Sequence, residues 1–167
     1  MLAYPVSNKP IDWQLQRVYI QPKLDGVRCV IQANTKRHIL TPDLNEIEVK
    51  AYSRTGKEWK NINHILEELI PFFQKYPNVI LDGELYNHDL RDNFEKNISL
   101  VRKTKPTDQD RQEASELTQF HCYDIIDETM EFDQRLNFIR NQVPITYCIK
   151  DVDTHHSINP HISKLFH

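Results

Sequence analysis

The chain has 167 residues, of which 39% are hydrophobic and 27% are charged, and its formal net charge is −3. This length predicts one domain with a hydrophobic core, and the composition excludes an intrinsically disordered chain. No apolar run approaches the roughly 20 residues that a membrane-spanning helix needs, and the first ten residues lack the apolar segment of a signal peptide. We therefore expect a cytoplasmic protein, or a nuclear one if its source is eukaryotic or viral, without a membrane partner.

The first two predicted strands flank a polar segment. The runs at 18–21 and 27–32 are both rich in β-forming residues. Pro22 lacks the N–H that a strand ladder needs, so it ends the first run, and 23–26 is predicted to be the turn between the two strands. Gly26 is expected there because glycine readily takes a positive φ.

The middle of the chain alternates between strand and helix patterns. Residues 46–54 alternate apolar and charged positions, which indicates a half-buried strand. Apolar residues recur at helical spacing over 62–73, although Pro71 is expected to strain or end that helix early. A strongly apolar strand is predicted at 78–86. The polar stretch at 90–117 predicts one or two surface helices, broken near Pro106.

The last third predicts further alternation. A strand is expected at 120–127, a helix at 131–141 and a strand at 145–152. Asn159 and Pro160 are typical of a helix cap and first helical position. Early hairpins followed by single helices between strands predict an α+β fold, with two antiparallel or mixed sheets flanked by helices.

Three cysteines, Cys29, Cys122 and Cys148, are widely spaced in strand-like runs. An odd number without a Cys-x-x-Cys pair argues against both a disulfide framework and a zinc site. Free cysteine usually packs as a small hydrophobic residue, so we expect three buried thiols. A net charge of −3 does not favour nucleic-acid binding, although a local basic stripe would still support it.

The segment KLDGVR, residues 23–28, has no evident packing reason to be a strand. A lysine amine can attack phosphorus or a carbonyl and form a covalent intermediate, but it is a poor nucleophile while protonated at its free pKa of about 10.4. A nearby metal ion or arginine lowers that pKa because it disfavours the charged form. Asp25 is suited to a hydrated metal or a substrate hydroxyl, and Arg28 to ribose or phosphate oxygens. The alternative is a solvated hairpin with ordinary surface charges.

KLDGVR resembles the nucleotidyl-lysine motif of the covalent nucleotidyltransferases, which include ATP-dependent DNA ligases, RNA ligases and mRNA capping enzymes. The segments SRTG (53–56), LDGEL (81–85) and FHCYDII (120–126) resemble the next three motifs, in family order and at family-like spacing. The opening MLA and SRTG resemble DNA ligases more than the other classes. The chain over 1–167 thus resembles a ligase adenylation domain, with an α+β nucleotidyltransferase fold that is ATP-grasp-like.

The resemblance implies catalytic roles for two residues and a metal role for a third. Lys23 would become linked to AMP from ATP. Asp25 would assist a metal-bound water or the hydroxyl of a nick. Glu84 would accept from a ribose hydroxyl or lie near Mg²⁺ or another divalent cation. The implied function is the sealing of nicks in duplex DNA, in replication and repair.

Four further residues are implied to bind the nucleotide. Gln21 would read the adenine edge, and Arg28 would contact the ribose. Arg54 would hold the 5′-phosphate of the nick or the nucleotide sugar. Tyr123 would stack on adenine where the family more often has phenylalanine, a change that keeps the aromatic face.

Each of these residues also has a simpler interpretation. Alone, Arg54 would be a surface arginine, Glu84 would follow a hairpin turn at Asp82-Gly83, and Tyr123 would be a core aromatic. The ordered set of four motifs favours the functional interpretation. The basic segment 102–105 resembles the paired-lysine motif of the family, but it lies between the third and fourth motifs rather than near the domain end. We therefore interpret it as a solvated segment, and a contact between it and DNA phosphate is left as an alternative.

The family pattern continues beyond this sequence. An E-G strand, a strand with the pattern L-K-x-K and an OB-fold domain are all expected by resemblance, and none follows Asp153. We therefore expect a C-terminally truncated adenylation domain without an OB-fold. The alternatives are an RNA ligase, a catalytically inert nucleotide-binding remnant, and one half of a split enzyme that needs a second polypeptide.

Overall fold

The computed structural model describes residues 11–12, 18–36 and 46–157. The chain divides into two compact units, one formed by residues 24–151 and the other by residues 1–23 with 152–167. The helix predicted at Asn159-Pro160 lies outside the described residues. Among the described residues, no helix has both the length and the apolar character needed to cross a membrane.

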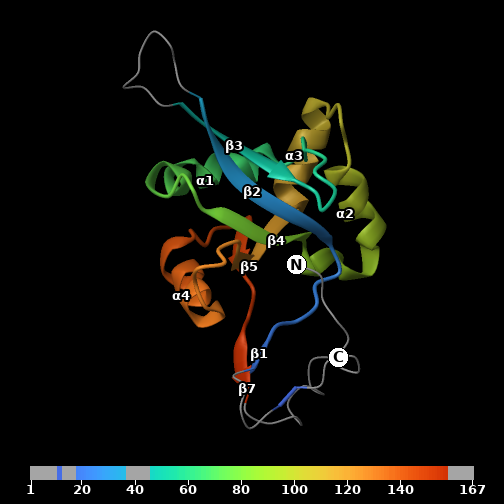
Figure 1. The fold of residues 1–167 in the computed structure, drawn as a ribbon. Coiled ribbons are helices and arrows are strands. Elements are labelled where there is room, and N and C mark those ends of the chain that lie inside the picture. The colour runs from blue at the N-terminus through green and yellow to red at the C-terminus, as the bar shows by residue number, and fades with distance from the viewer. Residues whose placement is uncertain (1–10, 13–17, 37–45, 158–167) are drawn as a thin grey trace. The chain divides into compact units, whose positions relative to one another are not determined.

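A five-stranded mixed sheet is the centre of unit 24–151 (Figure 1). Its order is β3-β2-β4-β5-β6; only β5 and β6 pair in parallel, and the other neighbours are antiparallel. The strands are β2 (Val27–Lys36), β3 (Glu46–Tyr52), β4 (Ile80–Tyr86), β5 (Gln119–Ile125) and β6 (Ile149–Asp151). The predicted α+β class with mixed pairing is confirmed.

Helices connect these strands where the apolar periodicity predicts them. They are α1 (Asn63–Lys75), the 3₁₀ helix η1 (His88–Asn93), α2 (Phe94–Val101), α3 (Asp108–Leu117) and α4 (Phe132–Gln142). The predicted break near Pro106 is confirmed, because α2 ends before it and α3 begins after it. Thr107 and Asp110 form a capping box that starts α3.

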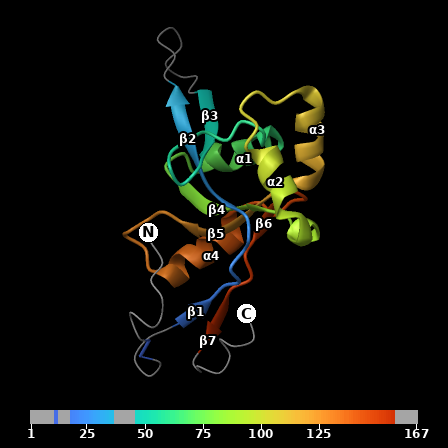
Figure 2. The same cartoon turned by 90° about the vertical axis from the view of Figure 1, so that its right-hand side faces the viewer.

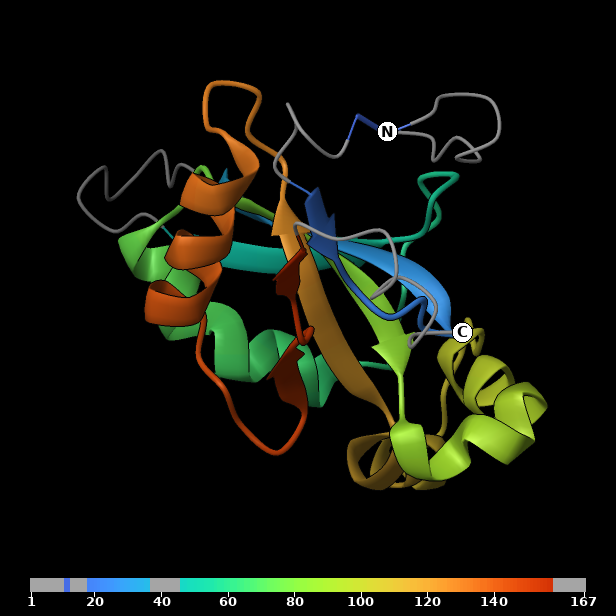
Figure 3. The same ribbon diagram turned by 90° about the horizontal axis from the view of Figure 1, so that it is seen from below.

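The hydrophobic core lies between one face of the sheet and the helices α1 and α4 (Figure 3). Side chains alternate along a strand, so β2 turns Cys29 and Ile31 into this core. The helices also pack against each other: the ring centroids of Phe138 in α4 and Phe72 in α1 are 6.3 Å apart. The three cysteines are buried and free, as predicted.

Pro71 does not end α1, so the predicted early end of that helix is wrong. The helix continues to Lys75, beyond a proline that is exposed. A proline in a helix leaves the carbonyl four residues earlier without its N–H partner, and that carbonyl belongs to Glu67, also exposed. Water can hydrate it there, while the buried rings of Phe72 and Phe73 hold the last turn on the core.

The other unit contains a two-stranded antiparallel pair, β1 (Val18–Ile20) with β7 (His155–Ser157) (Figure 2). The run of β-forming residues at 18–21 predicted β1, whereas β7, which is only three residues long, was not predicted. Residues 21–26 connect β1 to β2, as predicted, but they do not close a hairpin, since β1 pairs with β7 and β2 pairs with β3 and β4.

Gly26 is needed for space rather than for a positive φ. Among the described residues the only positive-φ glycine is Gly56, with φ +80°. A Cβ on Gly26 would lie 2.4 Å from the carbonyl oxygen of Leu85 and 2.8 Å from the Cγ of Glu84. The glycine therefore lets the chain pass directly against β4, beside one of the predicted site residues.

Candidate active site

Charged residues gather on the face of the sheet opposite the core. Strand β2 directs Arg28 to this face, and β4 directs Asp82 and Glu84 there, two residues apart. In the register of β2 with β4, Arg28 is directly opposite Glu84 and Val30 is opposite Asp82. Strand alternation thus concentrates one cation and two carboxylates on the polar face of neighbouring strands.

Asp82 is the centre of a hydrogen-bond network. Arg28 donates to it twice, from Nε to Oδ1 at 2.9 Å and from Nη2 to Oδ2 at 2.6 Å. The Tyr123 hydroxyl donates to Oδ1 at 3.2 Å. The Asp82 side chain is only 10% exposed, so the paired guanidinium compensates a carboxylate that would be costly to bury alone. This bond raises the pKa of Arg28.

A β-bulge brings Tyr123 into the network. In the register of β4 with β5, Asp82 is opposite Asp124 but Gly83 is opposite Cys122, which leaves Tyr123 as the extra residue. A bulge redirects side chains and is often found next to functional sites. Burial, and next the charge of Asp82, raise the pKa of the Tyr123 phenol, which therefore stays neutral at physiological pH.

Glu84 is a predicted site residue whose pKa is raised toward neutrality. Its pKa rises from an ordinary 4.5 to about 7, first because burial disfavours the anion and then because Asp82 lies nearby. Asp25 adds further repulsion, while the Gly26 N–H and Arg28 partly oppose the rise. Near neutral pH this carboxyl group can thus exchange a proton with solvent, or release it to solvent when a cation binds the carboxylate.

A basic pocket adjoins this network. It has a volume of about 440 Å³, and Arg28, Arg54, Lys57 and Arg102 line it, without any acidic lining residue. Arg54 lies in the turn after β3, whose Gly56 N–H donates to the Ser53 carbonyl at 2.9 Å. The structure therefore links Arg28 and Arg54 at one pocket, although the sequence places them 26 residues apart.

Five of the seven predicted site residues belong to unit 24–151. Arg28 connects them: its charge acts on Glu84 and Tyr123, Asp25 acts in turn on Glu84, and Arg28 also lines the pocket of Arg54.

The remaining two, Gln21 and Lys23, belong to the other unit. Gln21 donates from Nε2 to the Thr154 hydroxyl at 2.9 Å, and Lys23 is exposed immediately before the start of unit 24–151.

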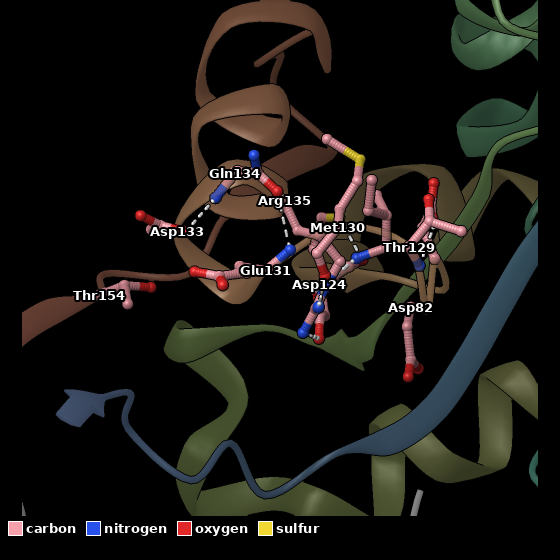
Figure 4. Close-up of polar contacts among 12 residues, drawn as sticks. Asp82, Asp124, Thr129, Met130, Glu131, Asp133, Gln134, Arg135 and Thr154 are labelled. Carbon is pink, nitrogen blue, oxygen red and sulfur yellow. Dashed lines mark hydrogen bonds and ion pairs between the residues drawn. The ribbon is translucent and has the colours of Figure 1, made fainter. Parts of the chain in front are cut away.

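Sequence reasoning missed Asp82 as a central residue, although LDGEL contains it. It also missed Arg135 of α4, which donates to Asp124 from Nε at 2.7 Å and from Nη2 at 3.1 Å (Figure 4). Arg135 further donates to the Met130 carbonyl at 2.7 Å. This arginine fixes the end of β5, directly after Tyr123. No sequence signal marks the pair, because 11 residues separate its members.

A divalent cation fits the polar face through a single carboxylate. Among the described residues, no group of three or more histidine, cysteine, aspartate or glutamate side chains could hold a metal ion. Mg²⁺ does not require such a cage, since it is often held by one or two carboxylates with water and substrate phosphates. Arg28 and Tyr123 occupy Asp82, so Glu84 is the better placed of the two to serve as ligand.

Comparisons with known proteins relate this site to one family. The family model "ATP dependent DNA ligase domain" matches residues 1–161. No curated protein matches the chain.

Several solved structures share the fold. One, described as "DNA binding with a minimal scaffold: Structure-function analysis of Lig E DNA ligases", is 21% identical with a TM-score of 0.62, and the match covers 98% of this chain and 54% of that one. Two named "Pmar-Lig_PreS3" and "Pmar-Lig_Pre." are 19% and 20% identical, with TM-scores of 0.63 and 0.64; the matches cover 98% and 99% of this chain and 37% of each of those.

The chain thus spans about half or less of the length of these structures. At identities this low, the TM-scores of these structures establish a shared fold and no more. The family model, in contrast, covers nearly the whole sequence. The resemblance inferred from KLDGVR and the three later motifs is confirmed at the level of the family. This chain belongs to the ATP-dependent DNA ligase domain family.

Proposed function

We propose that this chain forms a lysyl-AMP intermediate at Lys23 as the adenylation step of nick sealing in duplex DNA. The observation that carries the proposal is the Arg28–Asp82–Tyr123 network beside Glu84, which spans β2, β4 and β5 in a chain of this family; β2 is the first strand after Lys23. An aromatic ring, a guanidinium and an available carboxyl group are the groups that a nucleotide needs.

The proposed reaction is a displacement at the α-phosphorus of ATP. The Lys23 amine, after loss of its proton to solvent, forms the P–N bond, and the bond from that phosphorus to the bridging oxygen of pyrophosphate breaks. A divalent cation would neutralise charge on the phosphates. Glu84 would hold it, because a cation favours the anionic form of a carboxyl group whose pKa is about 7.

The other predicted residues have supporting roles in this proposal. Tyr123, which is half-buried, would stack on adenine and keep its hydroxyl bonded to Asp82. Asp82 holds the guanidinium of Arg28 by two bonds, and Arg28 would contact the ribose from that fixed position. Gln21 would read the adenine edge, Arg54 would hold phosphate, and Asp25 would assist a metal-bound water or the nick hydroxyl.

Transfer of label from nucleotide to protein tests this proposal. The purified chain is incubated with Mg²⁺ and either α-labelled ATP or α-labelled GTP, and protein-bound radioactivity is measured. We expect label from ATP alone and its loss in Lys23→Ala, with Lys60→Ala as a control that removes another exposed lysine. Absence of label on the unchanged chain, label from GTP, or equal labelling of Lys23→Ala would each contradict the proposal.

The substrate is tested separately from the labelling step. Preformed lysyl-AMP protein is mixed with a nicked DNA duplex or a nicked RNA duplex, each with a 5′-phosphate, and the transfer of AMP to the strand is followed. Transfer to DNA supports a DNA ligase. Transfer confined to RNA would contradict that part of the proposal and indicate an RNA ligase.

A further inference from the structure

The basic pocket contains two cationic side chains that lie outside the four family motifs. Lys57 follows the SRTG segment, and Arg102 follows the last residue of α2. Both are exposed, yet the pocket brings them beside Arg54 from different parts of the fold. The chain as a whole has more acidic than basic residues, 24 against 21, so a pocket with four cations and no acid is a local departure from its composition.

The cations of this pocket differ in whether their charge is already neutralised. Arg28 is bound to Asp82 through two nitrogen atoms. Among the described residues, Arg54, Lys57 and Arg102 have no ion pair. Three neighbouring positive charges without counter-charges repel one another, and a bound polyanion would relieve that repulsion.

The turn that carries Arg54 and Lys57 is well defined. The Ser53 N–H donates to the Lys57 carbonyl at 2.7 Å, and the Lys57 N–H donates to the Ser53 hydroxyl at 3.0 Å. The Trp59 indole, also in the pocket lining, donates from Nε1 to the Arg28 carbonyl at 3.3 Å. The turn is thereby attached to β2, which fixes where its two cations emerge.

The end of α2 is also anchored. Val101 is fully buried, and the buried Asn61 donates from Nδ2 to the Leu100 carbonyl at 3.0 Å. The Arg102 N–H donates to the Ile98 carbonyl at 3.0 Å, which continues the helical bonding by one residue. The next residue, Lys103, is paired with Asp110 at 3.0 Å. The basic segment is thus divided between a structural lysine and an arginine available at the pocket.

We propose that Arg102 and Lys57 bind backbone phosphates of a DNA strand, together with Arg54, in the pocket that these three side chains line. Phosphate contacts of this kind position a protein on nucleic acid and carry no sequence information. The choice of DNA rests on the proposed function, while the anionic chemistry follows from the pocket itself.

The salt dependence of DNA binding tests the proposal. Affinity of the purified chain for a nicked duplex is measured by fluorescence anisotropy over a series of salt concentrations. Each phosphate contact contributes about −0.9 to the slope of log affinity against log salt. We therefore expect Arg102→Ala and Lys57→Ala each to reduce the steepness by about one unit and to weaken binding about five- to tenfold near 0.1 M salt.

Matched controls separate a contact from a change in net charge. Lys105→Ala and Lys60→Ala remove the same charge within three residues of each test position, but neither lysine lines the pocket. We expect both controls to keep the unaltered slope and the same melting temperature as the test variants. Arg102→Lys should restore most of the slope, because a lysine supplies the charge at the same place.

Other outcomes would overturn the proposal. One is an unchanged slope in Arg102→Ala and Lys57→Ala, and another is an equal loss in the lysine controls. If the test variants instead weaken binding of ATP or pyrophosphate and leave the DNA slope intact, the pocket binds the triphosphate. None of these measurements requires lysyl-AMP, so failure of this inference is distinct from failure of adenylation at Lys23.

Discussion

The polar face and the basic pocket share Arg28 but use positive charge in opposite ways. On the polar face the charge of Arg28 is paired with Asp82, which also accepts from Tyr123. In the pocket, Arg54, Lys57 and Arg102 come together without an acidic lining residue. Charge that is paired inside the protein supports the fold and orients neighbours, whereas charge left without a partner is available to a ligand.

The comparison is tested most strongly by Asp82→Ala. Removal of this carboxylate leaves the half-buried guanidinium of Arg28 without a partner and the Tyr123 hydroxyl without its acceptor. We expect the free energy of unfolding to fall by about 2–4 kcal/mol, measured by urea denaturation. Glu128→Ala, which removes an exposed carboxylate, should change it by less than about 0.5 kcal/mol. A loss no larger than in this control would contradict the structural role of the pair.

One glycine lies beside the polar face and another lies in the turn that lines the basic pocket, so alanine substitutions at both positions test the backbone of each region. In Gly26→Ala the new Cβ would meet the Leu85 carbonyl oxygen at 2.4 Å, so backbone must shift, and we expect a loss of about 1–3 kcal/mol. In Gly56→Ala nothing lies within 4 Å, and only the strain of φ +80° remains, about 1 kcal/mol. Thermal denaturation of both variants checks the order. A larger loss in Gly56→Ala would show that Gly26 is not confined by β4.

The pH dependence of stability tests the electrostatics of the polar face. Because the pKa of Glu84 is raised from 4.5 to about 7, folding favours its protonated form. The free energy of unfolding should therefore fall as pH rises from about 4.5 to 7, by about 1–2 kcal/mol after allowance for solvent screening.

Glu84→Gln should lack this decline and be the more stable protein at pH 8. The measurement is urea denaturation at several pH values with EDTA present, so that no cation binds the carboxylate. Equal pH profiles of the two proteins would show that the carboxyl group is not perturbed.

The smallest effect on stability is expected in the pocket. Arg54 has no ion pair among the described residues, so Arg54→Ala should change the free energy of unfolding by less than about 0.5 kcal/mol. The same variant should weaken DNA binding in the salt series. If it instead destabilises the fold as much as Asp82→Ala, the distinction between paired and unpaired charge fails.

The sequence by itself determined most of the local structure and the family. Periodicities of 2 and 3.6 residues predicted β3, α1 and α4, because those segments bury one face, and a strongly apolar run predicted β4. The four ordered motifs led to the DNA ligase domain family, which the family model confirms.

Other features depended on tertiary structure alone. The separate pairing of β1 and β2, the close approach at Gly26 and the helix that continues past Pro71 result from contacts made elsewhere in the chain. The sharing of one pocket by Arg102 and Arg54 is of the same kind. A local sequence pattern cannot predict these features, because each depends on a contact with backbone or side chains that are distant in the sequence.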